Sequence, residues 1–504
     1  MSCIIHLHDD LSQNKDRVSV TTRHGPVTGG RASNGAIVFL EIPYALPPKR
    51  FSDPEPLPSD HRYEEREYIK ETSYAVQPNN DGQAAHVPFT NKVGLGQPSE
   101  NPLFLNIYIP PSFPSQKGFP VKVYIHGGFL QFGSPHGVSA QAHYVAAERS
   151  EVWVNIGYRV SAFGFVASDQ PRLTGNYGFK DQWLALQWVK LNIESFGGDP
   201  GNIQLQGLSA GAHSVHQQLF KVSYLPEGQK APFRSAVLRS NAIMTDPKTP
   251  EELRLQFRAL CKALELDPDS PDILDVLRDT VKVPWTKITK AIETDALGVQ
   301  YGTFRGCLSS DWISTSPGPM EMQRSGEFAR CLRERGVHSI AVGEVVDEWY
   351  IYSLSHPISS TRDIGPNLTR YFSEAFVEKL MQCFRKLPED ASQEDATKLF
   401  GEIMSSGFPV LRYNIEWVPE ESLVEGYVTH ACDKSLWTLS IPSMTADELN
   451  IARNWLKTFY DEVDGLKADD SHSMREPSVV LKLTKDRAVE WCVDKGYDDL
   501  LSKF

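Results

Sequence analysis

The 504-residue chain lacks any uninterrupted apolar run approaching the roughly 20 residues that a membrane-spanning helix needs. Its first residues hold only a short apolar stub, broken by histidines and acids, whereas a secretory signal needs an apolar stretch of about 7–15 residues. The final residues, LSKF, match neither a peroxisomal nor an ER-retention signal. These absences predict a protein without a membrane partner.

Cysteine is scarce and basic charge is in deficit. The seven cysteines are odd in number, scattered and never arranged as C-x-x-C, which is typical of a reducing compartment and gives no zinc-binding pattern. The 51 basic residues are outnumbered by 64 acidic ones, for a net charge of −13, which disfavours nucleic acid as a partner. We therefore predict a cytoplasmic protein with no metal and no nucleic-acid partner.

Internal repeats and low-complexity segments are also missing, and the middle of the chain alternates between two patterns instead. β-Rich runs at 121–128, 151–160 and 235–240 alternate with helical periodicity, for example over 180–198. Strands that alternate with helices imply a mostly parallel sheet covered by helices. Amphipathic helical patterns fill about 245–335, and no linker is present, so we predict one domain over 1–504 with a lid-like helical insertion there.

The stretch IQLQGLSAGAHSV places Ser209 within a G-x-S-x-G motif, Gly207 to Gly211. The motif alone is weak, because glycine at about 7% of residues gives a chance match in roughly one such chain in six. Its position between a strand and a helix is the context of a nucleophile elbow, and the helix N-terminus there offers N–H groups to a developing oxyanion. His126-Gly127-Gly128 follows an earlier strand, where an oxyanion loop of the HGGG type belongs. The two motifs together favour chemistry over two unrelated glycine turns.

Several longer segments carry a resemblance. EIPYALPPKRFSDPEP, SENPLFLNIYIP, NIGYRVSAFGF and GNYGFKDQWLALQWVKLNIESFGGDPGNI occur in this order before GLSAGAHSV. In these segments the chain resembles the type-B carboxylesterases, the cholinesterase-like family of α/β-hydrolases, and around Ser209 it is most similar to intracellular fungal members. The resemblance implies an α/β-hydrolase fold: a large central, mostly parallel mixed sheet flanked by helices, a small N-terminal subsheet and a helical insertion over the active site.

The resemblance also implies the remaining catalytic residues. The family's acid lies in a Gly-x-x-x-Asp-Glu-Gly segment, which GEVVDEW (343–349) matches, so the acid is Glu348, with Asp347 and Glu344 as alternatives. The family's Gly-x-x-His segment matches GYVTHACDKSLW (426–437), which makes His430 the base. His213 and His216 follow the serine more closely, but we expect them to point away from it as packing or surface residues.

One departure from the family falls in the oxyanion loop. The family reads His-Gly-Gly-Gly-Phe, whereas this chain has Phe129 after Gly127 and Gly128. The oxyanion donors are expected to be backbone N–H groups of this loop, Gly127 to Phe129, and of Ala210. A phenylalanine keeps its N–H but loses glycine's freedom to adopt a positive φ. We therefore predict that Phe129 either narrows the acyl pocket or weakens the oxyanion hole.

The resemblance further implies two structural ion pairs, Arg50 with Glu100 and Arg159 with Asp181. It places gorge or lid walls at Phe132, Trp285, Tyr301, Phe304 and Trp349, although each fits ordinary core equally well.

These residues predict a serine carboxylesterase that hydrolyses a hydrophobic carboxylic ester through an acyl-enzyme on Ser209. No metal or organic cofactor is required, the partner is a small-molecule ester, and the protein is expected to be a monomer or homodimer. Two alternatives stay open: acyl transfer, lactone formation or another biosynthetic reaction at the same triad, and a cholinesterase-like binding protein without chemistry.

Overall fold

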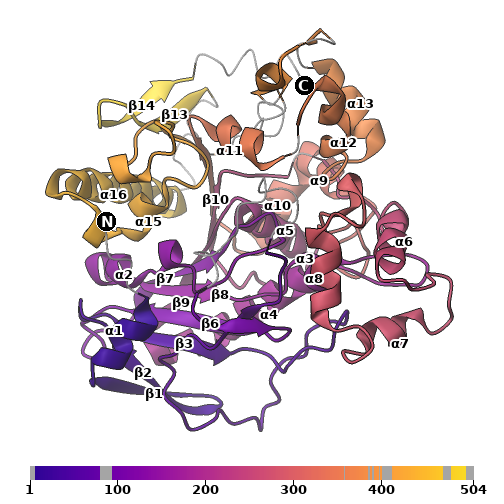
Figure 1. Ribbon diagram of the computed structural model, residues 1–504. Coiled ribbons are helices and arrows are strands. Elements are labelled where there is room, and N and C mark those ends of the chain that lie inside the picture. The colour runs from indigo at the N-terminus through magenta and orange to yellow at the C-terminus, as the bar shows by residue number, and fades with distance from the viewer. Residues whose placement is uncertain are drawn as a thin grey trace.

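The structure is a computed structural model, and it describes residues 6–79, 94–243, 245–356, 358–383, 386–388, 391–396, 398–399, 411–468 and 478–494. Within these residues one 12-stranded sheet forms the centre of the molecule (Figure 1), in the order β1-β2-β3-β6-β8-β7-β9-β10-β11-β12-β13-β14. Its strands are β1 (Arg17–Thr22), β2 (Gly25–Arg31), β3 (Ile37–Pro43), β6 (Phe104–Ile109), β7 (Phe119–Ile125), β8 (Val152–Ile156), β9 (Gly198–Leu208), β10 (Ser235–Arg239), β11 (Ser339–Val345), β12 (Leu411–Ile415), β13 (Val479–Leu483) and β14 (Val489–Val493). The short strands β4 (Ser73–Ala75) and β5 (Gln97–Ser99) pair separately.

Strand directions divide the large sheet into a parallel middle and antiparallel edges. Strands β8, β7, β9, β10, β11, β12 and β13 run parallel to their neighbours. β1, β2, β3 and β6 form an antiparallel edge, and β14 closes the other edge antiparallel to β13. The mostly parallel mixed sheet of an α/β-hydrolase is therefore confirmed. The N-terminal strands extend this sheet, so the predicted small subsheet is continuous with it.

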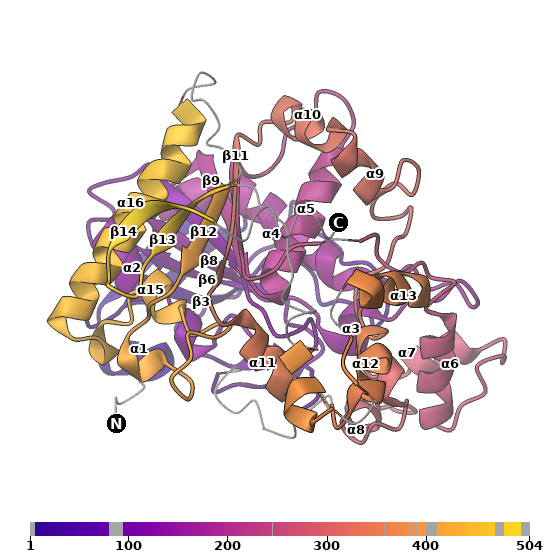
Figure 2. The ribbon, with the colours of Figure 1, turned by 90° about the horizontal axis from the view of Figure 1, so that it is seen from above.

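Helices cover both faces of the sheet (Figure 2). One face carries α4 (Tyr177–Asn192) and α5 (Ala210–Ser223), and the other carries α2 (His143–Arg149), α15 (Lys434–Thr438) and α16 (Ala446–Ala468). Strand β7 shows why both faces are covered: Val121, Val123 and Ile125 alternate with Lys122 and Tyr124, and all five are buried. The sheet is therefore packed on both sides, and only its ends are left for a site.

The remaining helices lie mainly in the two segments that follow β10 and β11. The segment between β10 and β11 contains α6 (Arg254–Ala263), α7 (Ile273–Arg278), α8 (Trp285–Glu293), α9 (Pro319–Arg324) and α10 (Glu327–Glu334), in the region where an insertion was predicted. The segment after β11 contains α11 (Glu348–Ser355), α12 (Ile364–Leu368) and α13 (Glu374–Cys383). Two shorter helices, α1 (Leu7–Gln13) and α3 (Ser161–Phe165), complete the set in the described residues. No described helix is long and apolar enough to cross a membrane.

The carboxyl ends of the parallel strands bring distant motifs together. The His126-Gly127-Gly128 turn follows β7, Ser209 follows β9, and Glu348 follows β11. In open parallel sheets this edge is where ligands bind. The two ion pairs implied by the resemblance are both present: Arg50 Nε lies 2.8 Å from Glu100 Oε2, and Arg159 Nη2 lies 2.7 Å from Asp181 Oδ1.

Candidate active site

Ser209 occupies a strained turn between β9 and α5. Its backbone has φ 60° and ψ −125°, a conformation that costs a non-glycine residue on the order of 1–3 kcal/mol. The turn is held by the N–H of Ser209, which donates to the carbonyl of Arg239 at 2.8 Å, and by the N–H of His213, which donates to the carbonyl of Ser209 at 3.0 Å. Strain of this kind persists only where the surroundings enforce it, and it presents the hydroxyl at the end of the sheet.

The glycines on either side of Ser209 are required by close packing. A Cβ on Gly207 would lie 2.3 Å from the backbone of Gly211, and a Cβ on Gly211 would lie 2.1 Å from the carbonyl oxygen of Ile125. Backbone atoms cannot move away as a flexible side chain does. Glycine is therefore required at both positions of the motif because α5 packs closely against β7 and β9.

The loop after β7 lies directly against this turn. A Cβ on Gly127 would lie 2.5 Å from the carbonyl oxygen of Leu208 and 3.0 Å from Ser209 Cβ. Gly128 has φ 114°, and Phe129 follows with φ 54°, so the phenylalanine adopts the positive φ that the family's glycine would adopt freely. The loop therefore passes directly against the serine with Phe129 held at a positive φ.

Four backbone N–H groups around Ser209 have no acceptor in the described residues: those of Gly127, Gly128, Phe129 and Ala210. Ala210 is the first residue of α5, where the N–H is not used within the helix and the helix dipole is positive. The carbonyl of Gly127 also fixes the loop, because it accepts from His126 Nδ1 at 2.9 Å. Burial lowers the pKa of His126 to about 4, so this imidazole is neutral and acts as a fixed donor.

Glu348 and His430 form a buried pair at the same edge. His430 Nδ1 lies 2.5 Å from Glu348 Oε2, and the N–H of Val345 donates to Glu348 Oε1 at 3.2 Å. Both side chains are more than nine-tenths buried. A carboxylate on Nδ1 fixes the tautomer with the lone pair on Nε2, and His430 Nε2 has no partner in the part of the chain described.

The two alternative acids do not contact His430. Asp347 holds the loops instead: its N–H donates to the carbonyl of Val428 at 3.0 Å, and its Oδ2 accepts from the N–H of Val428 at 3.1 Å. Glu344 lines the same cavity as Ser209, where desolvation of its carboxyl group and the charge of Glu348 raise its pKa to about 7. Of the three carboxylates, the structure pairs Glu348 with the imidazole.

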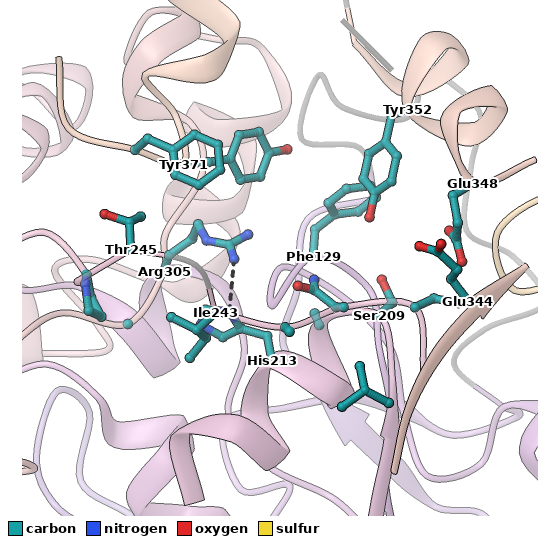
Figure 3. A pocket seen from close by; sticks show the side chains of 18 of the residues that line it. Phe129, Ser209, His213, Ile243, Thr245, Arg305, Glu344, Glu348, Tyr352 and Tyr371 are labelled. Carbon is teal, nitrogen blue, oxygen red and sulfur yellow. Dashed lines mark hydrogen bonds between the residues drawn. The ribbon is translucent and has the colours of Figure 1, made fainter. Parts of the chain in front are cut away.

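Ser209 and Glu348 line one cavity of about 330 Å³, which falls within the size range of small-molecule sites. In Figure 3, Ser209 lies between Glu344 and Glu348 on one side and Arg305 and Tyr371 on the other. Tyr352 lines this cavity and also packs against the candidate base, with its ring centroid 5.5 Å from that of His430. No direct hydrogen bond joins Ser209 to His430 in the described residues, and such bonds are often long before substrate binds.

Phe129 is part of the cavity wall and packs in an aromatic cluster. Its ring lies 6.1 Å from Phe132, 6.2 Å from Tyr352 and 6.2 Å from His356, measured between ring centroids. Tyr301 also lines the cavity, as one of the predicted gorge walls. Phe132 and Phe304 are buried core, while Trp285 packs against the core, and Trp349 stacks edge-on with its neighbours Tyr350 and Tyr427.

The sequence analysis did not predict two residues that line the cavity, His213 and Arg305. His213 was expected to point away from the serine, and this is wrong, because its position one turn into α5 places it on the cavity wall. His216 is buried and accepts a hydrogen bond from the N–H of Ile243, as a packing residue does. Arg305 carried no motif, and its segment approaches the sheet only through the tertiary fold. No group of three or more His, Cys, Asp or Glu side chains suited to a metal occurs in the described ranges.

The chain matches the family model of the carboxylesterase family over residues 16–327. It is 28% identical to an uncharacterized esterase/lipase of Schizosaccharomyces pombe, over 91% of this chain and 91% of that protein. It is also 28% identical to a carboxylic ester hydrolase of Gibberella moniliformis, over 92% and 90%. The solved structure of a pNB esterase superposes with a TM-score of 0.74 at 22% identity, covering 96% of this chain and 99% of that one, which shows a shared fold.

Proposed function

The chain belongs to the carboxylesterase family, and we propose that Ser209, His430 and Glu348 are its catalytic triad. The family and its esterase relatives make it a serine carboxylic ester hydrolase, and they do not favour the acyltransferase or binding-protein alternatives. The observation that carries the triad is the buried Glu348–His430 pair at the same sheet edge as the strained Ser209.

The proposed reaction is hydrolysis through an acyl-enzyme. His430 Nε2 takes the hydroxyl proton as Ser209 Oγ attacks the ester carbonyl carbon, and Glu348 stabilises the imidazolium that forms. The bond to the alcohol then breaks, and the alcohol leaves with the proton from His430. Water repeats the sequence, which releases the carboxylic acid and restores the free serine.

The proposed oxyanion hole consists of the N–H groups of Gly128, Phe129 and Ala210, and Gly127 allows the close approach of this loop to Ser209. All three donors lack other acceptors in the described residues, so none must break a bond to receive the oxyanion. Donors fixed in advance stabilise the developing charge without reorganisation, and one such donor contributes about 10²–10³ in rate.

A fluorophosphonate probe tests the nucleophile. Intact-protein mass spectrometry should show one adduct on the wild type and on the control Ser115→Ala, whose serine is exposed, and none on Ser209→Ala. An adduct that persists in Ser209→Ala would refute the assignment, as would the absence of any adduct on folded wild type.

The acid is tested by comparing three variants, Glu348→Gln, Asp347→Asn and Glu344→Gln. Only Glu348 contacts His430, so only Glu348→Gln should lower kcat by about 10³–10⁴, because an amide donor on Nδ1 favours the wrong tautomer. A comparable loss confined to Asp347→Asn or Glu344→Gln would move the acid to that position.

We further propose a cytoplasmic enzyme that acts on a small-molecule ester as a monomer or homodimer. The five cysteines whose side chains are described are all free thiols, which supports a reducing compartment. Cell fractionation and light scattering of the purified protein test these two expectations.

A further inference from the structure

Arg305 places a positive charge on the wall of the cavity that contains Ser209. The side chain is half-buried, and its guanidinium lies between Tyr371 and His213 (Figure 3). The guanidinium carbon is 4.9 Å from the centre of the Tyr371 ring, and Nη2 donates to His213 Nδ1 at the long distance of 3.4 Å. Burial and Arg305 together keep the pKa of His213 well below its usual value, so that imidazole stays neutral.

No carboxylate neutralises Arg305 within the described residues. The carboxylates at this end of the cavity accept backbone N–H groups instead: Asp246 from Met320 at 3.0 Å and Glu252 from Thr249 at 2.7 Å. Burial lowers the pKa of Arg305, and only tyrosines act against that effect. A guanidinium is charged at any physiological pH, so holding it half-buried on the cavity wall without an anion carries a desolvation cost.

At the opposite end of the cavity, in contrast to Arg305, the basic side chains have carboxylate partners. There Arg412 forms an ion pair with Asp494, and Lys482 Nζ lies 2.7 Å from Glu416 Oε1. Those cations are neutralised by the protein itself. Arg305 is therefore distinguished from them by its lack of a protein anion.

A second arginine, Arg370, adds to the positive charge at the end of the cavity where Arg305 lies. Arg370 lines the same cavity and is 4% exposed, yet its Nε and Nη1 have no hydrogen-bond partner among the described residues. It precedes Tyr371, the residue whose ring packs on Arg305. Buried guanidinium N–H groups without acceptors are rare, because each carries a desolvation penalty.

The position of Arg305 relative to the triad assigns it to one half of the ester. His430 must protonate the leaving alcohol, so the alcohol lies on the side of the Glu348–His430 pair. Arg305 lies on the other side of Ser209 in Figure 3. We assign that side to the acyl group, because the alcohol takes the side of His430. The wall between them includes the apolar side chains of Phe129 and Ile243.

We infer that the acyl group of the preferred substrate ends in a carboxylate, which Arg305 binds at the far end of an apolar segment. The substrate class is then a half-ester of a dicarboxylic acid, and hydrolysis with one water gives the diacid and an alcohol. This inference rests on the proposed function. The fork of guanidinium N–H groups matches a carboxylate in geometry, and such charge-assisted pairs are the strong class of hydrogen bond.

The test uses para-nitrophenyl half-esters of glutaric, adipic and pimelic acids beside the esters in which a carboxamide replaces the free carboxylate. The two series have the same shape and differ in charge. At the best chain length the wild type should prefer the carboxylate by at least about tenfold in kcat/KM, the value of one charge-assisted hydrogen bond. Arg305→Met should remove this preference but keep the activity on the carboxamide esters, and Arg305→Lys should retain part of it.

Arg172→Met is the matched control, because Arg172 is exposed and pairs with Asp311 outside the cavity. Equal kcat/KM for both series in the wild type, or a preference unchanged in Arg305→Met, would overturn the inference while leaving the esterase intact. A preference only for esters whose alcohol carries the carboxylate would overturn the acyl-side assignment. No hydrolysis of either series together with no fluorophosphonate adduct on Ser209 would overturn the proposed function itself.

Discussion

Asp347 and Val428 join the two loops that carry the candidate acid and base through a reciprocal pair of hydrogen bonds. The N–H of Asp347 donates to the Val428 carbonyl at 3.0 Å, and the N–H of Val428 donates to Asp347 Oδ2 at 3.1 Å. Glu348 and His430 lie 82 positions apart in the chain. Their contact therefore depends on loops that another residue pair holds in register.

This relationship predicts that Asp347 positions the pair. Asp347→Ala removes one of the two bonds and should lower the free energy of unfolding by about 1 kcal/mol and kcat severalfold, with KM little changed. Asp347→Asn keeps an acceptor oxygen and should restore most of kcat. Urea unfolding and steady-state kinetics measure both effects. A loss of the same size in both variants would show that the charge matters rather than the hydrogen bond.

The glycines of the elbow predict a contrast between two alanine substitutions. Gly211→Ala would place its Cβ 2.1 Å from the Ile125 carbonyl oxygen, so we expect a large loss of melting temperature and of probe labelling at Ser209. Gly465 lies inside α16 with nothing within 4 Å of the same atom, so Gly465→Ala should stabilise by about 0.5–1 kcal/mol. Thermal unfolding compares the two, and an unaffected Gly211→Ala would contradict the close packing.

The Phe129 side chain predicts a size preference. Phe129→Ala should raise kcat/KM for esters with bulky acyl groups relative to acetate, because the ring forms part of the cavity wall. The variant also loses the contacts with Phe132, Tyr352 and His356, so its melting temperature should fall. The measured quantity is the ratio of kcat/KM for a long or branched ester to that for acetate. An unchanged ratio would show that another residue limits the acyl group.

Buried histidines predict a loss of stability in acid. Burial lowers the pKa of His126, His143 and His216 to about 4. The unfolded chain binds protons at these sites below about pH 6.5, while the folded chain stays neutral down to about pH 4. Stability is therefore complete above pH 6.5 and falls as the pH decreases toward 4, by up to about 1.4 kcal/mol per pH unit for each histidine.

The variant His143→Phe isolates one of these groups, because His143 Nδ1 has no partner in the described residues. Urea unfolding at several pH values between 7.5 and 4.5 should give a shallower decline in the free energy of unfolding for this variant than for the wild type. An identical decline would assign the acid sensitivity to other groups.

The sequence predicted the alternation of strands and helices, and it predicted the positions of the elbow and the glycine loop. These features depend on periodicity and turn residues within short segments of the chain. Ser209 and Gly128 are such cases. Strands β13 and β14 were missed, since their short runs near the C-terminus carry no distinctive pattern and gain their identity only by pairing with β12. The triad residues and their roles stay predictions until the variants above are measured.

The sequence by itself determined the backbone path at the elbow, because only glycine fits where β7, β9 and α5 meet. Tertiary structure decided which of three nearby carboxylates reaches His430 and which side chains surround Ser209. His213 lines the cavity because of the face that α5 turns toward it. Arg305 lines the cavity from the segment between β10 and β11. The physical reason is that a turn depends on neighbours in the chain, whereas a cavity depends on contacts between elements that no local pattern encodes.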